Sequence, residues 1–326
     1  MAVGIRGVAA CLFAIASVLG SAVADDRLDE IRVDYAYYSP PSLVLKRFGW
    51  LEESFKADGT AVRWVLSQGS NRALEYLAGG GVDFGSTAGL AALLARANDN
   101  PIRTVYVYSR PEWTALAVRR DSPLRSVADL KGRKIAATKG TDPYLFLLRS
   151  LRQFNVNRGD VEIVHLQHPD GRVALEQGRV DAWAGLDPHL AASELDAGSR
   201  ILYRNPAFNT YGVLNTTQAF LDQHPKEVRR MLGAYERARQ WISAHPRETA
   251  RIVAEEAHIP LAVAERLLAR TGFPDPAPGG EQRDVLVAAA PLLVEEGLIR
   301  KGVDPIRTID ELLEPGPARE AVAAAR

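Results

Sequence analysis

Short apolar runs alternate with stretches in which apolar residues recur at helical spacing, from Ile31 to about Asn215. The runs that favour strands are residues 31–37, 61–67, 82–84, 102–108, 113–119, 134–137, 161–165, 182–185, 201–204 and 211–215. The stretches that favour helices are residues 42–48, 71–78, 90–97, 144–154, 173–177 and 189–197. Strands that alternate with helices predict β-α-β units and mostly parallel, helix-covered sheets. Because the units outnumber what one compact sheet needs, the pattern predicts an α/β chain with two lobes.

The pattern changes to almost pure helix after Asn215. The helical stretches there are residues 218–223, 226–244, 247–256, 261–269 and 282–296. Pro225, Pro246 and Pro260 precede three of them, which is typical of helix starts, where the missing N–H of proline would be unpaired anyway. The last residues, 316–326, are rich in alanine, and we expect a disordered tail there.

The first residues carry the features of a secretory signal peptide. Arg6 supplies an early positive charge, residues 8–20 are apolar, and Ala-Val-Ala at 22–24 provides a cleavage site. We expect cleavage after Ala24, so that residues 1–24 leave the mature chain and the protein is exported to the periplasm. A membrane anchor is the alternative, but the apolar run falls short of the roughly 20 residues that span a bilayer.

The single cysteine, Cys11, lies inside that segment. Residues 8–11 loosely imitate a lipoprotein acylation site, but the apolar run continues well beyond Cys11, which disfavours lipidation. The mature chain then has no cysteine and needs no disulfide in an oxidising compartment.

Composition and charge are those of an ordinary soluble globular protein, with 47% hydrophobic and 25% charged residues. Lys+Arg and Asp+Glu both number 40, which gives a formal net charge of +0. No overall field therefore favours nucleic acid or an anionic membrane, and we expect neither as a partner. Any charge on a ligand must be matched locally.

Four predicted strand-to-helix turns are rich in small polar residues, namely residues 39–42, 68–71, 85–89 and 139–143. In open α/β sheets ligands bind at the carboxyl ends of strands, where these turns lie. Helix N-termini there present unpaired N–H groups and a partial positive charge, which suits an anion. The alternative is that such residues only cap helices, and Asp142 before Pro143 is close to an ideal pair for that purpose. The candidate ligand-binding residues from these turns are Ser39, Ser86, Thr87, Thr141 and Asp142.

Aromatic residues lie near the predicted lobe edges at Tyr35, Tyr37, Tyr38 and Trp113. Most aromatic side chains belong to the core, but their flat faces also suit ligand contact. Tyr37 and Trp113 therefore join the candidate ligand-binding residues.

Signatures of catalysis are poor. The sequence has no G-x-S-x-G nucleophile elbow, no phosphate loop and no dinucleotide-type glycine fingerprint. His165, His168 and Asp170 suit a metal by residue type, but side chains three apart at a strand end point to opposite faces and no further ligands cluster with them. We therefore expect a protein that is not an enzyme and has no cofactor and no metal.

Several segments together resemble one known family. They are Ile31–Tyr35 with the serine-containing turn after it, Leu77–Gly85, Asp121–Ala136, Lys139–Thr141, and Val180–Trp183 with Asp187-Pro188. The chain resembles the periplasmic nitrate/sulfonate/taurine-type binding proteins of ABC importers, and most of all their aliphatic-sulfonate members. The resemblance spans roughly residues 30–245.

The resemblance implies a type II periplasmic-binding-protein fold with an added helical C-terminal region. Lobe 1 would comprise residues 25–109 and 206–315, and lobe 2 residues 110–205. A small molecule would bind between the lobes, where Asp187 joins the candidate residues, and shift the equilibrium toward the closed form. The closed form would then dock on a transmembrane permease driven by a cytoplasmic ATPase. We expect the protein itself to be a monomer.

Ala36, Asp142 and Leu186 depart from the family pattern. Sulfonate-binding relatives usually have a glutamine, a Gly-Ser-Ser or Gly-Ser-Asn turn, and a tryptophan there. A carboxylate at position 142 would repel a sulfonate unless it is protonated or turned to cap its own helix; it could instead face a cation, beside Glu112. An amine-containing or zwitterionic ligand, a periplasmic sensor, and an enzyme of the thiamine-pyrimidine synthase branch therefore stay open as alternatives. The mature chain's lack of cysteine disfavours the last.

Overall fold

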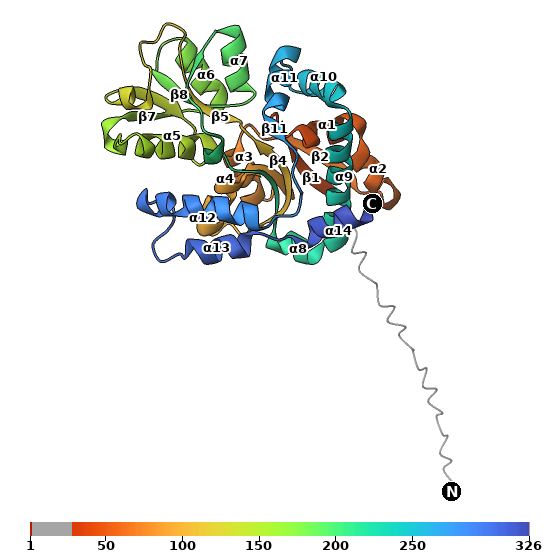
Figure 1. Cartoon of the computed structure of the whole chain (residues 1–326). Coiled ribbons are helices and arrows are strands. Elements are labelled where there is room, and N and C mark those ends of the chain that lie inside the picture. The colour runs from red at the N-terminus through yellow and green to blue at the C-terminus, as the bar shows by residue number, and fades with distance from the viewer. Residues whose placement is uncertain (2–27, 326) are drawn as a thin grey trace.

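Two β-sheets organise the chain, whose computed structural model describes Met1 and residues 28–325 (Figure 1). The predicted cleavage site and Cys11 lie outside these described residues. The strands of the first sheet are β1 (Glu30–Tyr35), β2 (Ala61–Leu66), β3 (Phe84–Ala88), β4 (Ile102–Pro111), β10 (Gly212–Thr217) and β11 (Thr271–Gly272). Their order across the sheet is β11-β4-β10-β3-β1-β2. We call this sheet and the helices that pack on it lobe 1.

The second sheet is built from the middle of the chain. Its strands are β5 (Thr114–Val118), β6 (Lys134–Ala137), β7 (Glu162–His165), β8 (Ala182–Leu186) and β9 (Arg200–Tyr203), in the order β7-β6-β8-β5-β9. Figure 1 shows this sheet and its helices above the first sheet, and we call them lobe 2. The exact domain boundaries given by the resemblance stay a prediction.

Both sheets are mixed, although the sequence pattern predicted mostly parallel strands. β1 runs parallel to β2 and β3, and β6 runs parallel to β7 and β8. β10 is antiparallel to β3 and β4, and β5 is antiparallel to β8 and β9. The reason is the connection between the lobes, because β4 leads into β5 and β9 leads back to β10, so these linking strands reverse direction against their neighbours.

Helices cover both sheets. Those of lobe 1 are α1 (Pro40–Phe48), α2 (Trp50–Phe55), α3 (Ser70–Ala78) and α4 (Gly89–Ala97), and those of lobe 2 are α5 (Asp142–Gln153), α6 (His168–Glu176) and α7 (His189–Asp196). The C-terminal helices are α8 (Gln218–Gln223), α9 (Pro225–Ala244), α10 (Pro246–Glu256), α11 (Leu261–Ala269), α12 (Gly280–Glu295), α13 (Pro305–Leu312) and α14 (Gly316–Ala324). Short 3-10 turns lie at Lys56–Asp58, Val127–Leu130, Arg158–Asp160 and Pro206–Phe208. Within residues 28–325, no helix is long and apolar enough to span a bilayer.

The C-terminal helices complete the core of lobe 1. Met231 and Tyr235 of α9 are fully buried in the cluster that contains Ile31, Val33 and Phe84 of the first sheet. Burial of side chains of this size contributes about 2 kcal/mol each, which fixes α9 on the sheet.

The predicted disordered tail is instead helical. Residues 316–324 form α14, which packs against α9, and Ala318 and Ala321 are buried. The alanine-rich sequence that suggested fraying favours a helix because alanine has the highest helix propensity, and the small buried side chains permit close packing. The prediction of disorder over residues 316–325 is therefore wrong.

The third strand also lies later than its pattern indicated. β3 spans residues 84–88, so the segment predicted as a turn, which contains Ser86 and Thr87, is a fully buried strand. Its small polar residues resemble a loop in sequence. They form a strand because β1 and β10 flank them on both sides, and the backbone groups pair with those neighbours.

Candidate ligand-binding site between the lobes

Segments that follow the carboxyl ends of strands in the two lobes meet at one interface. Gly69, which follows β2, lies against His168, which follows β7: a Cβ atom added to Gly69 would lie 3.1 Å from His168 Nε2. Tyr38, which follows β1, packs edge-on against Trp113 in the link between β4 and β5, with ring centroids 5.9 Å apart. We call this contact region the interlobe interface, and it lies where ligands bind in open α/β sheets.

Asp34 is a fully buried carboxyl at the end of β1. Its Oδ1 accepts hydrogen bonds from the Ser86 backbone N at 2.8 Å and from Ser86 Oγ at 2.9 Å. Burial raises the pKa of Asp34 to about 6, although the hydrogen bonds from Ser86 oppose that rise. The Tyr38 hydroxyl donates to the Ser86 carbonyl at 3.0 Å. Ser86, a predicted ligand-binding residue, is therefore committed to Asp34 and Tyr38.

Three buried hydroxyl groups near Asp34 form no well-aligned hydrogen bond within the described residues, and two of them, Ser39 Oγ and Tyr235 OH, lie close to each other. They are Ser39 Oγ at the start of α1, Tyr108 OH on β4 and Tyr235 OH on α9. Burial raises the pKa of both tyrosines well above the ordinary value, so they stay neutral donors. An unpaired buried hydroxyl costs about 1–3 kcal/mol, so these groups are suited to receive an acceptor from outside the chain.

Asp142 and Trp113 connect α5 of lobe 2 to the segment that returns to lobe 1. Trp113 Nε1 donates to Asp142 Oδ2 at 3.1 Å, and Thr210 donates to the same carboxylate from its backbone N and from Oγ1, both at 2.9 Å. Burial raises the pKa of Asp142, and the donors on Thr210 and Trp113 oppose the rise.

Asp142 does not cap α5, contrary to the capping alternative in the sequence analysis. Thr141 occupies the N-cap position and Asp142 is the first helical residue, and the helix has no side-chain cap bond. From that position the carboxylate turns toward the segment containing Thr210. Asp142 therefore links the lobes.

Thr87 and Thr141 are buried, and their hydroxyl hydrogens are already used. Thr87 Oγ1 donates to the Ala88 carbonyl at 3.0 Å and accepts from Asn215 Nδ2 at 2.8 Å. Thr141 Oγ1 donates to the Thr138 carbonyl at 2.7 Å. Of the predicted serine and threonine residues, only Ser39 forms no well-aligned side-chain hydrogen bond within the described structure.

Tyr37 lies apart from these groups. It is half-buried and packs against Leu43, Val253 and Ala264, away from Trp113. The structure brings its neighbour Tyr38 to Trp113 instead. Tyr37 and Tyr38 form the turn that follows β1, closed by the bond from the Ser39 backbone N to the Ala36 carbonyl at 2.8 Å, and this turn directs their side chains to different neighbours.

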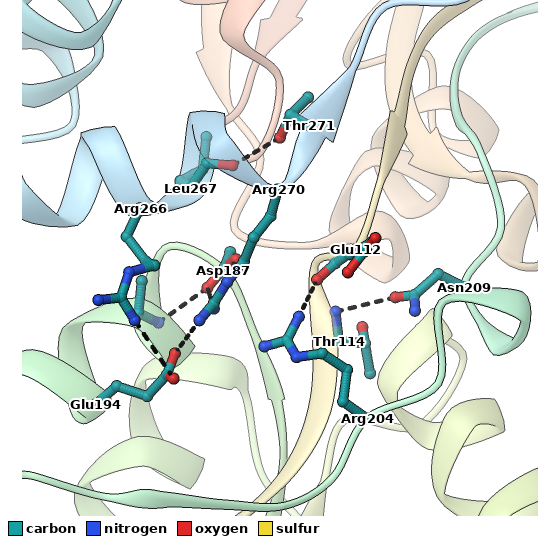
Figure 2. A network of polar contacts seen from close by, with 11 residues as sticks. Glu112, Thr114, Asp187, Glu194, Arg204, Asn209, Arg266, Leu267, Arg270 and Thr271 are labelled. Carbon is teal, nitrogen blue, oxygen red and sulfur yellow. Dashed lines mark hydrogen bonds and ion pairs between the residues drawn. The ribbon is translucent and has the colours of Figure 1, made fainter.

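Asp187 lies in a network of charges that joins α7 of lobe 2 to α11 (Figure 2). Arg270 Nη1 is 3.4 Å from both Asp187 oxygens, and Arg270 Nη2 donates to Glu194 Oε2 at 2.5 Å. Arg266 Nη1 is 3.7 Å from Glu194 Oε1. The Asp187 Oδ1 atom also accepts from the Ala191 backbone N at 2.9 Å. Burial raises the pKa of Asp187 to about 6, and Arg270 opposes the rise.

Buried apolar residues lie beside these charges. Ala191 and Ala192 of α7 form a small cluster with Val263 of α11, and Ile259 packs against it. Arg204, which donates to the Glu112 carbonyl at 2.8 Å, lies close to this network in Figure 2. A groove of about 680 Å³ opens nearby, with Arg110, Glu112, Tyr211 and Arg270 among its lining residues.

Sequence reasoning missed several members of this interface. Asp34 and Tyr108 carried a weak signal, since each is a polar side chain at the end of an apolar strand run. Tyr235 and Arg270 carried none, because they lie in the C-terminal helical region, which showed no site pattern. Among the described residues, no group of three or more His, Cys, Asp or Glu side chains is placed to hold a metal ion.

A family model described as "NMT1/THI5 like" matches residues 49–249. The chain belongs to the NMT1/THI5-like family. This match, with the relatives below, confirms the resemblance drawn from the sequence motifs and the two-lobed α/β architecture.

Solved structures and a curated relative agree with that assignment. The alkanesulfonate-binding protein SsuA from Xanthomonas axonopodis pv. citri, solved with bound MOPS, is 27% identical, with a TM-score of 0.78 over 86% of this chain and 98% of that chain. The periplasmic aliphatic sulphonate binding protein SsuA from Escherichia coli is 26% identical, with a TM-score of 0.74 over 88% of this chain and 92% of that chain. The taurine-binding periplasmic protein of Escherichia coli (strain K12) is 25% identical over 59% of this chain and 60% of that protein. All three are named as binding proteins.

Proposed function

We propose that this chain is the periplasmic binding component of an ABC importer, and that it binds an aliphatic sulfonate at the interlobe interface. The observation that carries the proposal is the buried Ser39 hydroxyl, which follows β1 and lies close to the Tyr235 hydroxyl, itself near Tyr108. Neutral hydroxyl donors stabilise the oxygens of an anion without a counter-ion. The sulfonate-binding relatives supply the ligand class.

The α5 helix offers a second set of donors. The backbone N–H groups of Asp142 and Tyr144 have no intrahelical partner and no side chain caps them, while Pro143 between them has no N–H. The partial positive charge at that helix end adds to the attraction for an anion. Ser39 belongs to lobe 1 and α5 to lobe 2, so an anion that contacts both favours the closed arrangement.

The bonding of Asp142 favours an anion over an amine. Both carboxylate oxygens already accept hydrogen bonds, from Trp113 and Thr210. Asp142 is therefore not a free anchor for an ammonium group, and its repulsion of a sulfonate is reduced by those donors. The importer role implies a permease with its ATPase as partner, and uptake of the sulfonate by cells should require this chain.

Ser39→Ala is the direct test of the site. We expect the wild-type chain to bind ethanesulfonate or MOPS in calorimetric titrations, and Ser39→Ala to bind about 10–100-fold more weakly, since one hydrogen bond to a charged group is lost. Ser243→Ala is the matched control, because Ser243 Oγ donates to the Arg239 carbonyl on the exposed end of α9. Equal affinity in Ser39→Ala, or a wild-type chain that binds no sulfonate, would refute the proposal.

A further inference from the structure

One end of the interlobe interface gathers acceptor atoms without partners. His168 is fully buried, and its Nε2 atom forms no hydrogen bond to any described residue. Asn71 Oδ1 and Gln167 Oε1 are likewise buried and unpaired. A Cβ atom added to Gly69 would lie 3.1 Å from His168 Nε2 and 2.9 Å from Asn71 Oδ1, so both acceptors lie against the same side of Gly69. We call Gly69, Asn71, Gln167 and His168 the acceptor end.

The hydrogen bonds around His168 fix its protonation. Thr138 Oγ1 donates to the Leu166 carbonyl at 2.7 Å, so that its hydroxyl hydrogen is used. The same oxygen lies 3.1 Å from His168 Nδ1 and can only accept there, which places the ring hydrogen on Nδ1. Burial lowers the pKa of His168 to about 3, so the ring is neutral and Nε2 presents a bare lone pair.

Two helix N-termini also meet at this position. Gly69 is the N-cap of α3 and Gln167 is the N-cap of α6, and neither helix has a side-chain cap bond. Their unpaired N–H groups are donors, and both ends carry partial positive charge. A group that fits must therefore donate to His168 and accept from the N–H groups. A hydroxyl does both, whereas an ammonium can donate to the acceptors but has no lone pair for the N–H groups.

The acceptor end is continuous with the rest of the proposed site. Ser70 Oγ, the first residue of α3, accepts from the Ala88 backbone N at 2.9 Å at the end of β3. Thr138, which holds His168, also accepts from Thr141 at the start of α5. If the anionic group of a small ligand lies at α5 and Ser39, these bonded segments lead from it to the acceptor end. The other end of the ligand can therefore reach Asn71 and His168.

We propose that the acceptor end binds a neutral hydroxyl group of the ligand, so that the preferred class is hydroxyalkanesulfonates. The inference rests on the sulfonate function proposed above, and His168 is its specificity-determining residue. The hydroxyl hydrogen points to His168 Nε2, and the hydroxyl oxygen accepts from the first turn of α3.

The test compares ligands that differ only at the far end. Calorimetric titrations use ethanesulfonate, 2-hydroxyethanesulfonate and 2-aminoethanesulfonate, together with the three-carbon counterparts. In at least one length series the wild-type chain should bind the hydroxyl compound about tenfold more tightly than the unsubstituted one, and more tightly than the amine. In His168→Leu the ratio of hydroxyl to unsubstituted compound should fall toward one, while His245→Leu, at the exposed end of α9, keeps it.

Asn71→Ala provides a second reading if His168→Leu does not fold, and should lower the same ratio. Equal affinities for all three compounds in both length series of the wild-type chain would overturn the inference while leaving the sulfonate function intact. The inference would also be overturned if His168→Leu still bound the hydroxyl compound more tightly than the unsubstituted one. If His168→Leu does not fold, the same result in Asn71→Ala would overturn it. If Asn71 turned its amide nitrogen toward His168, the ring would need no ligand donor and equal affinities would result. Failure of every sulfonate to bind would overturn both proposals.

Discussion

The two ends of the interlobe interface are held in opposite ways. At one end Arg270 pairs with Asp187 and Glu194, so charges on the protein satisfy each other across the lobes. At the acceptor end His168 and Asn71 meet Gly69 with their acceptor atoms unpaired. The charged end therefore stabilises the closed arrangement without a ligand, whereas the acceptor end gains its hydrogen bonds only when a ligand supplies a donor. The charged end therefore favours closure of the lobes, and the acceptor end determines which ligand is bound.

We call Arg270, Asp187 and Glu194 the charged end. Removal of its cation, Arg270, should have the largest effect on the affinity for a sulfonate. Arg270→Met leaves Asp187 without its paired cation and Glu194 with only the more distant Arg266, and loss of one partner from a buried pair costs about 3 kcal/mol. We expect ethanesulfonate to bind about 100-fold more weakly and the radius of gyration in X-ray scattering to rise. Arg283→Met is the control, because its pair with Asp310 is exposed and contributes little.

Replacement of the two carboxylates by amides should restore part of the affinity that Arg270→Met loses. Addition of Asp187→Asn and Glu194→Gln to Arg270→Met removes the uncompensated charge, so binding should recover. A triple variant no better than Arg270→Met would show that packing, and not charge, holds this end.

A side chain at Gly69 should prevent closure at the acceptor end. The Cβ of Gly69→Val would lie 2.9 Å from Asn71 Oδ1, at the end of a side chain that can turn away, and 3.1 Å from the buried ring atom His168 Nε2, which the added methyl groups crowd further. Overpacking of this kind costs about 2 kcal/mol, so we expect about 30-fold weaker binding with little change in the melting temperature of the unliganded chain. Gly159→Val is the control, since an added Cβ there meets nothing within 4 Å. Unchanged affinity in Gly69→Val would mean that the lobes need not approach at this point.

The two ends should also respond oppositely to pH. The pKa of Asp187 is raised to about 6, above its unfolded value, so its contribution to stability is present at low pH and is lost as the pH rises from about 4 through 6. The pKa of His168 is lowered to about 3, so protons bind the unfolded chain preferentially and stability is lost as the pH falls from about 6.5 toward 3.

Melting curves against pH can separate these two contributions. The difference between wild type and Asp187→Asn should fall with rising pH between 4 and 6, and the difference between wild type and His168→Leu should rise, each by a few degrees. If both differences in melting temperature changed in the same direction with pH, the division between a charged and a neutral end would be contradicted.

The sequence alone predicted the layout of the fold better than the details of the site. Alternating strand and helix patterns predicted two α/β lobes, and the prolines at 225, 246 and 260 marked helix starts that the structure confirms. β3 was placed too early because Ser86 and Thr87 are typical of a turn, and only flanking strands make them a strand. Ser39 could be selected from its turn, since a polar residue at a strand end is a local signal.

The interlobe partners could not be predicted because they are distant in sequence. Arg270 and Asp187 are 83 residues apart, and Asp142 and Thr210 are 68 apart. No local pattern reports such a pairing. Asp142 is the clearest case, because its Asp-Pro sequence predicts a helix cap while the fold supplies three stronger donors from other segments.

The bonds from Asp142 to Thr210 and Trp113 also define where the lobes pivot. Both partners belong to the segments through which the chain passes between the lobes, so these bonds lie on the axis of rotation, where displacement is smallest. Gly69 and His168 belong to elements outside these segments, so their contact separates more when the lobes open, whereas the Glu112 N–H ties the Arg270 carbonyl to the linking segment at 2.7 Å. Paired fluorescent labels on the outer faces of α3 and α6 should therefore report the motion of the lobes on ligand binding.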